Sequence, residues 1–335
     1  MSSYISTTDS AQIMPERRLS LAPMMDYTDR HDRYLLRLIT KEMWLFTEMI
    51  TTNTLLNAEP QRFLKHDESE HPVAIQLGGS NPADLATCSK LAEQAGFDEV
   101  NLNVGCPSDR VKSGRFGASL MATPELVGRC MQAMQAGVKI PVSVKCRLGI
   151  DDQDEYHHLK NFISVVSGAG CEIFYIHARK AWLQGLSPKE NRDIPPLNYE
   201  AVYRIKEEFP KLEVIINGGI KTLSDTKTHL QHVDGCMIGR EAYSNPYMLA
   251  EVDRVLYGSN ADLKSRMAIL SQYIDYIDNE MLSGTSLTQM SRHVLGLFQG
   301  IPGAKLWRRH ISENAHKVGS NSQLLLEAAE FIREN

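Results

Sequence analysis

The chain contains 335 residues, of which 42% are hydrophobic and 23% are charged, and its formal net charge is −5. This composition is ordinary for a soluble globular protein, and the length allows one large domain and a smaller one. The acidic total excludes a chain-wide positive charge, so a nucleic acid would need a local basic patch. No apolar run approaches the roughly 20 residues that cross a bilayer, so we expect no membrane association.

The N-terminal segment, residues 1–18, is polar and lacks the apolar core of a signal peptide. We therefore expect a flexible tail there. Six cysteines are scattered along the chain without any C-x-x-C pair, which argues against a zinc site and against a disulfide framework. The expected compartment is a reducing cytoplasm, and no metal is expected.

Eight short β-type runs follow one another over the first 240 residues. Most are continuously apolar, as expected of parallel strands whose sheet is covered on both faces. They are residues 19–23, 43–50, 73–78, 99–105, 142–148, 173–179, 213–219 and 236–240. Helical periodicity separates most of them, most clearly at 82–96, 124–137 and 199–209. The sixth connection, 180–198, is long, polar and proline-containing, which favours a functional loop.

Eight β-then-α repeats of this length predict an α/β fold, a (β/α)₈ TIM barrel over residues 19–250. A doubly wound open sheet is the main alternative, but it would place a G-x-G-x-x-G turn after the first strand, and none is present. Residues 251–335 carry only helical patterns, at 264–281, 287–298, 304–317 and 323–333. They predict a separate small all-helical domain.

The carboxyl ends of the predicted strands carry polar residues, and in this fold the reactive groups come from those ends. A single lysine or histidine at such a place is commonly just a solvated or hydrogen-bonded residue. Many of them at one rim are costly to bury unless a polar ligand pairs with them. The residues are Pro23, Met24, Glu48, Gln76, Asn101, Asn103, Cys106, Lys145, Arg147, His177, Arg179, Asn217, Gly218, Gly219, Gly239 and Arg240.

Two glycine turns follow the seventh and eighth strands, at Asn217–Gly218–Gly219 and at Gly239–Arg240. Glycines at these two strand ends let backbone N–H groups close on a phosphate, and the arginine adds a bidentate charge. The alternative is a pair of ordinary tight turns. We interpret the two turns as a phosphate site.

A phosphate site beside inward-facing Gln76, Lys145 and His177 suits a bound flavin mononucleotide (FMN). A cation near the N1/O2 edge of the flavin stabilises the negative charge that reduction places there, and an amide can bind the polar edge of the ring. The segment Ala22–Pro23–Met24 is expected to line one side of the ring.

Together these motifs resemble the tRNA-dihydrouridine synthases over essentially the whole chain. The matching stretches are LAPMMDYTDR, IQLGG, NLNVGCP, VKCRLG, IHAR, INGGI and IGR. The segments ARKAWLQGLSPKENRDIPPLNY and LWRRH resemble the A-type bacterial subfamily in particular. The resemblance implies tightly bound FMN, NADPH as electron donor, and uridines of the tRNA D-loop near position 20 as substrate. It assigns flavin binding to Pro23, Met24, Gln76, Lys145, His177, Asn217, Gly218, Gly219, Gly239 and Arg240, and proton donation to Cys106.

The chemistry of uracil reduction explains a thiol at residue 106. Hydride from flavin N5 adds to C6, charge develops as an enolate, and C5 must receive a proton from the opposite face. An ordinary thiol, with a pKa of about 8.5, is mostly protonated at neutral pH yet can release its proton to carbon. The alternative, a small apolar core residue, is the expected fate of the other five cysteines. Pro107 and the polar run after it favour exposure of Cys106, and Asn103 is a candidate to bind the uracil edge.

Two local basic clusters are candidates for tRNA contact despite the acidic total. The sixth connection offers Arg179, Lys189 and Arg192, and the segment 292–317 offers Arg308 and Arg309. Trp307 and Phe298 are candidate stacking surfaces for bases. The alternative is an ordinary solvated helix face.

Three other functions remain open from the residues alone. A barrel aldolase or phosphosugar enzyme would form a Schiff base on Lys145 and hold a substrate phosphate in the glycine turns. The other two are an RNA-binding or chaperone protein built on a flavin barrel, and a flavin dehydrogenase of free pyrimidines. We expect a monomer.

Overall fold

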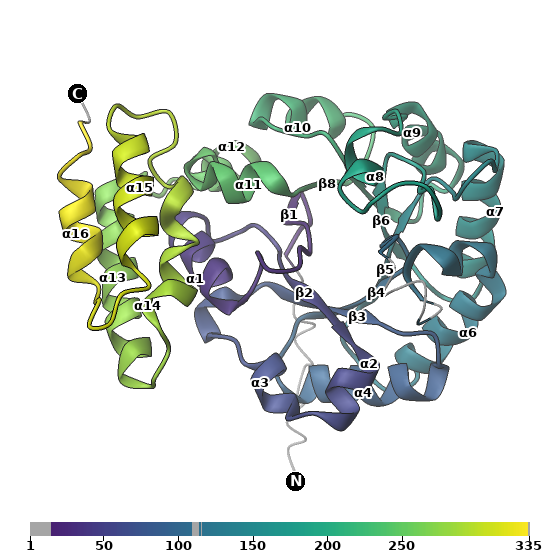
Figure 1. Cartoon of the computed structure of the whole chain (residues 1–335). Helices are drawn as coiled ribbons and strands as arrows, with labels where there is room; N and C mark the ends of the chain where they lie inside the picture. The colour runs from purple at the N-terminus through teal and green to yellow at the C-terminus, as the bar shows by residue number, and fades with distance from the viewer. Residues whose placement is uncertain (1–14, 109–113, 115, 334–335) are drawn as a thin grey trace, which may run out of the picture.

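The computed structural model describes residues 15–108, 114 and 116–333, which form a barrel of strands and helices followed by a helical bundle (Figure 1). The predicted tail therefore lies outside the described residues except for residues 15–18. In the part of the chain that the structure describes, no helix combines the length and apolarity needed to cross a bilayer.

Eight parallel strands make one sheet in the order β1-β8-β7-β6-β5-β4-β3-β2. They are β1 (Leu19–Leu21), β2 (Leu45–Thr51), β3 (Val73–Gly78), β4 (Glu99–Asn103), β5 (Val142–Arg147), β6 (Ile173–His177), β7 (Glu213–Asn217) and β8 (Gly235–Ile238). The bridge between Ser20 and Trp44, with hydrogen bonds from Leu21 N to Trp44 O (2.8 Å) and from Trp44 N to Leu19 O (3.0 Å), joins the two ends of the sheet. The predicted TIM barrel is confirmed.

Helices cover the outside of the barrel, and several begin where the sequence signals predict. Asn81 caps the helix that opens on Pro82, since its side chain accepts hydrogen bonds from the N–H groups of Ala83 and Asp84. The helices of this part are α1 (Arg30–Ile39), α2 (Thr52–Asn57), α3 (Pro60–Leu64), α4 (Pro82–Gln94), α6 (Pro124–Gln135), α7 (Glu155–Gly168), α8 (Glu190–Asp193), α9 (Tyr199–Glu208), α10 (Leu223–His229), α11 (Arg240–Ser244) and α12 (Val252–Tyr257).

The C-terminal helices are α13 (Arg266–Leu282), α14 (Leu287–Ser291), α15 (Ala304–Asn314) and α16 (Gln323–Ala329). The helix predicted over 287–298 ends earlier, at Ser291, and a 3₁₀ turn at Val294–Gly296 follows it. Gly296 packs against the end of α11 so closely that a Cβ there would lie 2.6 Å from the Ser244 carbonyl oxygen. The chain therefore has to turn at that contact instead of continuing the helix. The boundary predicted at residue 250 stays a prediction.

The bundle docks on α1 through aromatic and charged contacts. The ring of Tyr276 on α13 stacks on Tyr34 at a centroid distance of 3.9 Å, and its hydroxyl lies 2.8 Å from His31 Nδ1. Arg30 forms an ion pair with Glu280, and Asp29 forms an ion pair with Arg292 and a hydrogen bond with His293 Nε2 (3.1 Å). The helical bundle therefore lies beside the start of α1, next to the rim where β1 ends (Figure 1).

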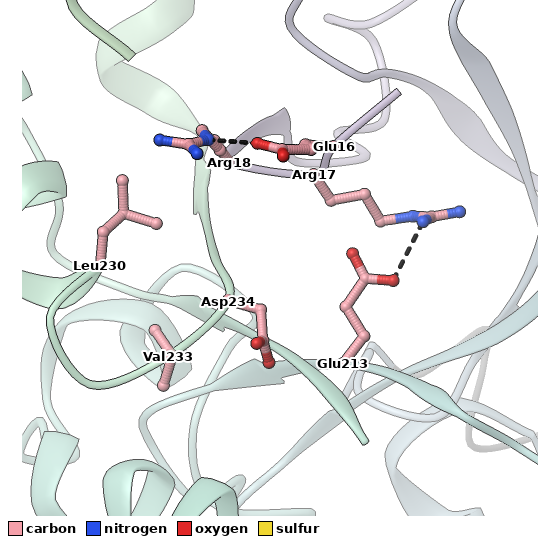
Figure 2. Close-up of a pocket in the computed structure, with 7 residues that line it drawn as sticks. All are labelled: Glu16, Arg17, Arg18, Glu213, Leu230, Val233 and Asp234. Atoms are coloured by element: carbon pink, nitrogen blue, oxygen red, sulfur yellow. Dashed lines mark hydrogen bonds and ion pairs between the residues drawn. The ribbon is translucent and has the colours of Figure 1, made fainter. Parts of the chain in front are cut away.

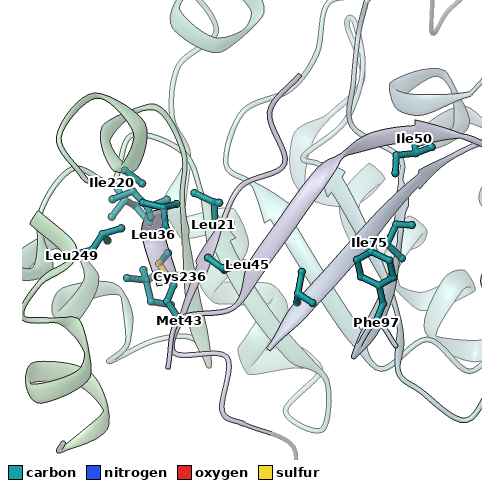
Figure 3. Packing of buried hydrophobic residues seen from close by; sticks show 14 of the residues in the cluster. Leu21, Leu36, Met43, Leu45, Ile50, Ile75, Phe97, Ile220, Cys236 and Leu249 are labelled. Carbon is teal, nitrogen blue, oxygen red and sulfur yellow. The ribbon is translucent and has the colours of Figure 1, made fainter. Parts of the chain in front are cut away.

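Alternate residues of each strand face the helices or the barrel axis. Outward residues such as Leu21, Leu45 and Ile75 are fully buried and belong to the large apolar cluster beneath the helices (Figure 3). Inward residues Trp44, Phe46, Tyr175 and Met237 form a separate apolar cluster inside the barrel. Strand β4 departs from this apolar filling, because its inward residues are Glu99, Asn101 and Asn103, all buried.

The amino-terminal end of the barrel is filled by charge. Arg17 lies over the ring of Trp44 at 4.3 Å and forms ion pairs with Glu99 (2.8 Å) and Glu213 (3.0 Å). Arg17 and Glu213 also line a cavity of about 420 Å³ at this end, with Leu230, Val233 and Asp234 among its other walls (Figure 2). This cavity lies at the end of the barrel opposite to the polar strand ends.

Closure of the barrel is expected to depend on Gly235 at the start of β8. A Cβ at this position would lie 2.0 Å from the Arg17 carbonyl oxygen. We expect Gly235→Ala to lower the free energy of unfolding by about 1–3 kcal/mol or more, because the backbone before β1 would have to move. The measurement is denaturant unfolding. Gly168→Ala at the end of α7, where a Cβ meets nothing within 4 Å, is the control and should not destabilise. Equal losses for the two variants would contradict this packing.

Candidate active site

Five predicted side chains from five consecutive strands lie together at the carboxyl rim of the barrel. They are Gln76 of β3, Asn103 of β4, Lys145 of β5, His177 of β6 and Asn217 of β7. The strand register pairs Asn103 with Lys145 and His177 with Asn217. Hydrogen bonds from Asn103 Nδ2 to Gln76 Oε1 (2.7 Å) and from Lys145 Nζ to Asn217 Oδ1 (3.1 Å) join them in pairs. The structure therefore brings the predicted set together as one polar ring.

Lys145 is a cation held in a poorly hydrated place. Burial of the ammonium group, followed by the nearby charge of Arg147, lowers the pKa of Lys145 to about 8. The amide oxygen of Asn217 is its hydrogen-bond acceptor, and a carbonyl dipole stabilises an ammonium less than a carboxylate does. An anionic ligand at the rim would raise the pKa of this lysine again by stabilising its charged form.

His177 has an unpaired buried nitrogen. Among the described residues, Nδ1 of its ring has no hydrogen-bond partner. Burial, together with the charges of Arg147 and Lys145, holds the pKa of His177 well below its ordinary value, so the ring is neutral at neutral pH. A buried polar atom without a partner is rare, and it fits a polar group of a ligand at this rim.

The turn after β7 leaves no room for side chains. Gly218 and Gly219 have φ angles of +119° and +73°, and a Cβ at Gly219 would lie 2.6 Å from Leu197 Cδ1. Asn217 Nδ2 donates to the Met237 carbonyl oxygen (2.7 Å), which ties this turn to β8. The packing of Leu197 and the positive φ angles therefore require glycine at these two positions, and the phosphate-binding role of the turn stays a prediction.

The ends of β1 and β8 form the adjoining wall. The N–H of Ala22 donates to the Ile238 carbonyl oxygen (2.7 Å), and a Cβ at Gly239 would lie 3.5 Å from both Ala22 Cβ and Met24 Sδ. Pro23 lies between these two residues in a half-buried position. Arg240, the first residue of α11, is exposed and its guanidinium group pairs with Asp193 Oδ1 at 2.9 Å. Its phosphate-binding role therefore stays a prediction.

Cys106 differs from the other cysteines in its exposure. All six cysteines are described; five are buried and Cys106 is partly exposed. Its backbone is held at both ends, because its N–H donates to Asn103 Oδ1 (3.0 Å) and its carbonyl accepts from Ala118 N (2.9 Å). Its Sγ lies 3.5 Å from the Ser108 hydroxyl. The thiol therefore lies on a fixed loop beside the polar ring.

Arg147 holds this loop, and no role was predicted for it. Its buried guanidinium group donates to the carbonyl oxygens of Gly105 (2.9 Å), Lys180 (3.1 Å) and Asn191 (3.0 Å). Burial lowers the pKa of Arg147 to about 10, so the group stays charged. A sequence signal existed, since Ser143, Lys145 and Arg147 alternate along β5 and so share the inner face.

The predicted tRNA residues fall into two groups. In the sixth connection Lys189 and Arg192 are exposed, whereas Arg179 donates to the carbonyl oxygens of Asp193 (3.4 Å) and Pro195 and so braces the loop. On α15, Arg308 donates to Gln299 Oε1 (2.9 Å) and exposed Arg309 pairs with Glu313 (2.8 Å).

The prediction that Trp307 and Phe298 offer stacking surfaces is wrong. Both side chains are fully buried and contact each other edge to face, with ring centroids 4.8 Å apart. Trp307 lies three and four residues from Ala304 and Ile311, so it shares their buried helix face. The two aromatics form the core of the bundle.

Taken together, the polar groups at the rim fit an anionic cofactor with a polar ring edge. Among the described residues, no group of three or more His, Cys, Asp or Glu side chains is arranged to hold a metal ion. The unpaired His177 nitrogen and the ammonium of Lys145 are polar groups of the kind that would hold the polar edge of FMN.

Comparison with known proteins agrees with the resemblance. The family model described as dihydrouridine synthase (Dus) matches residues 20–333. A tRNA-dihydrouridine(20/20a) synthase of Vibrio vulnificus is 60% identical over 312 residues, covering 93% of this chain and 95% of that protein. One from Escherichia coli (strain K12) is 55% identical over 329 residues, covering 96% and 95%. The predicted family and its bacterial A-type branch are confirmed.

A solved structure of a 2-naphthoyl-CoA reductase with 2-naphthoyl-CoA shares the fold. The TM-score is 0.54 at 12% sequence identity, and the match covers 73% of this chain and 51% of that one. At this level of identity the likeness concerns the fold alone.

The lowered pKa of Lys145 predicts a pH-dependent affinity for FMN. Below pH 8 the lysine of the free protein is charged; above about pH 8 it loses its proton, while binding of an anionic ligand favours the protonated form. We therefore expect the FMN association constant to be level below pH 8 and to fall above it, as measured by fluorescence titration.

Lys145→Met should bind FMN more weakly and without this fall. The control is Lys206→Met, which removes an ammonium paired with Asp234 (2.8 Å) at the other end of the barrel. A fall that persists in Lys145→Met would assign the titration to another group.

Proposed function

This chain belongs to the dihydrouridine synthase family, and on that premise we propose that it reduces the C5–C6 double bond of uridines in tRNA. The relatives that match over nearly their whole length are named tRNA-dihydrouridine(20/20a) synthases, which supports uridines at positions 20 and 20a of the D-loop as substrates. A tRNA substrate implies a cytoplasmic location. The aldolase and chaperone alternatives have no comparable support.

The proposed cofactor is FMN, with NADPH as the electron donor. When bound and reduced, FMN supplies hydride from its N5. The residues that would hold it are Ala22, Pro23, Met24, Gln76, Lys145, His177, Asn217, Gly218, Gly219, Gly239 and Arg240. Lys145 would stabilise negative charge at the N1/O2 edge, and the glycine turns would receive the phosphate.

The protein's own contribution to the reaction is a proton donor, the thiol of Cys106, held near the substrate. Hydride arrives at C6, and Cys106 Sγ–H gives its proton to C5, so the base gains H⁻ and H⁺ and becomes 5,6-dihydrouracil. The thiolate left behind regains a proton from water. The hydrogen bond from the Cys106 N–H to Asn103 Oδ1 would fix the position from which the thiol reaches the base. One Nδ2 hydrogen of Asn103 is used by Gln76, which leaves the other for the uracil edge.

The observation that carries the proposal is the placement of Cys106. It is the partly exposed thiol among six cysteines, and its loop is tied to the polar rim by Asn103 and Arg147. A proton donor has to face the substrate from a fixed position, and a cysteine buried in the core does not face it.

The tRNA would contact two separated basic groups, one at Arg179, Lys189 and Arg192 and one at Arg308 and Arg309. In Figure 1, α8 lies over the barrel, whereas α15 lies in the C-terminal bundle, with α11 and α12 between them. An extended, charged ligand suits this arrangement better than a free pyrimidine. We propose that a monomer suffices.

The test of the reaction is Cys106→Ala. We expect uridine reduction to fall by about 10²–10⁴-fold, since a general acid typically contributes that much. FMN content and tRNA affinity should not change. Dihydrouridine formation on unmodified tRNA is the assay. Cys130→Ala, which removes a buried thiol, is the control and should retain activity. Full activity in Cys106→Ala would refute the proton-donor role.

The test of the RNA contacts is salt dependence. The Lys189→Ala/Arg192→Ala double variant should weaken tRNA binding and reduce the slope of log K against log[salt] by about 1.5, if both side chains contact phosphates. Reduction of bound flavin by NADPH should be unaffected. The control is Lys139→Ala/Lys211→Ala, two exposed lysines that precede β5 and β7 at the opposite end of the barrel. An unchanged slope in the first variant would reject the assignment.

A further inference from the structure

A continuous series of buried hydrogen bonds runs inside the barrel from its amino-terminal end to the Cys106 loop. Ser143 Oγ donates to Glu99 Oε1 (2.5 Å), and Asn101 Nδ2 donates to Ser143 Oγ (2.7 Å). Gln76 Nε2 donates to Asn101 Oδ1 (2.8 Å). The series ends at the rim with Asn103 and the Cys106 N–H. Its side chains are at most 7% exposed.

Every link in this series has the same direction, from the rim down to Glu99. Glu99 is paired with Arg17 (2.8 Å), and an ionised carboxylate can only accept. Ser143 must therefore give its single proton to Glu99 and accept from Asn101. The oxygen of Asn101 must then face Gln76, and the oxygen of Gln76 must face Asn103. Only the oxygen of Asn103 is left to accept from Gly105 N (3.2 Å) and Cys106 N (3.0 Å).

The groups around Glu99 give its carboxylate the accepting role. Burial lowers the pKa of Arg17, but the charges of Glu99 and Glu213 outweigh this effect and raise the pKa above its ordinary value. Tyr175 Oη donates to Glu99 Oε2 (3.3 Å), and burial raises the pKa of Tyr175, so that its hydroxyl remains a donor. All the partners of the carboxylate are donors.

We propose that Glu99 is a positioning residue, whose charge fixes the amide orientations of Asn101, Gln76 and Asn103 and thereby holds the Cys106 loop and the flavin-facing amide of Gln76. The inference rests on the proposed function for its consequence in catalysis. The orientations themselves concern the protein alone and can be measured without flavin or RNA.

Glu99→Gln is the informative change, because the new side chain has nearly the same shape. It can donate as well as accept, so it no longer sets the direction of the hydrogen bonds. Arg17 would retain the oxygen of the new amide, so its NH₂ group would face Ser143. The serine proton then loses its acceptor, and the series is free to run the other way. The reversed series ends with Asn103 Nδ2 against the N–H groups of Gly105 and Cys106, which is a contact between donors.

The first measurement is amide hydrogen exchange of the flavin-free protein in the peptide 102–108. In Glu99→Gln we expect exchange at Gly105 and Cys106 to accelerate by roughly threefold to tenfold, which corresponds to the loss of one ordinary hydrogen bond. Glu213→Gln is the matched control. It removes a second carboxylate that pairs with Arg17 (3.0 Å) but accepts nothing from the series. Equal exchange in the two variants would refute the proposal.

A double-mutant cycle separates a directional effect from general weakening of the barrel. If Glu99 acts through Ser143, then Glu99→Gln adds nothing to exchange at residues 102–108 once Ser143→Ala is present. An undiminished effect in that background would overturn the proposal. Should Glu99→Gln fail to fold, Ser143→Ala carries the same test. Its control is Ser89→Ala, which removes a buried hydroxyl from α4 (Ser89 Oγ to Leu85 O, 2.8 Å).

In catalysis, Glu99→Gln should lower kcat for uridine reduction more than it raises KM for tRNA, since the basic residues proposed to hold the tRNA backbone lie elsewhere and only the Asn103 contact with the base would change. An unchanged kcat alongside altered exchange would show that loop orientation does not govern the reaction, and would overturn that part of the proposal. A wild-type protein without flavin uptake or uridine reduction would instead contradict the proposed function, and the exchange comparison would stand.

Discussion

The need to pair every buried polar group governs the inside of this barrel. Most small barrels fill their interior with apolar side chains, and this one does so with Trp44, Phe46, Tyr175 and Met237. Strand β4 instead directs Glu99, Asn101 and Asn103 inward, and each is tied to a neighbouring strand. Because an unpaired polar atom in such a place is destabilising by about 1–3 kcal/mol, these residues fix one another's positions. The backbone of Cys106 is held by one of them, because its N–H donates to Asn103.

The same principle distinguishes two kinds of polar group at the rim, those that are fully paired within the protein and those that are not. The amides of Gln76, Asn103 and Asn217 have protein partners, whereas Nδ1 of His177 lacks one among the described residues and Lys145 has only an amide oxygen. The chain belongs to the dihydrouridine synthase family, and the incompletely paired His177 and Lys145 would serve the reaction of that family. The protein supplies charge and fixed donors, and the cofactor would supply the electrons.

The sequence was sufficient for the barrel because eight apolar runs alternate with helical periodicity at nearly constant spacing, and few folds satisfy both. It was sufficient for the rim because parallel strands all end on one side, so residues after each run meet in space. The sequence was insufficient for Trp307. A tryptophan in a basic segment suggests an exposed position, and only the packing of the helix shows that it lies on the buried face. The ion pair of Arg240 was beyond the sequence as well, because its partner Asp193 lies in a connection whose path no local pattern fixes, while the phosphate-binding role of Arg240 stays a prediction. The inward residues of β4 could have been found, as E-V-N-L-N alternates polar and apolar positions.

The partial exposure of a single sulfur has a consequence outside the reaction. A partly exposed thiol is open to reagents in solution, and oxidation to sulfenic acid would leave no S–H bond at that position. The five buried cysteines are shielded from the same attack. If Cys106 is the proton donor, a chemical change at this one sulfur would abolish the reaction while leaving the buried core untouched.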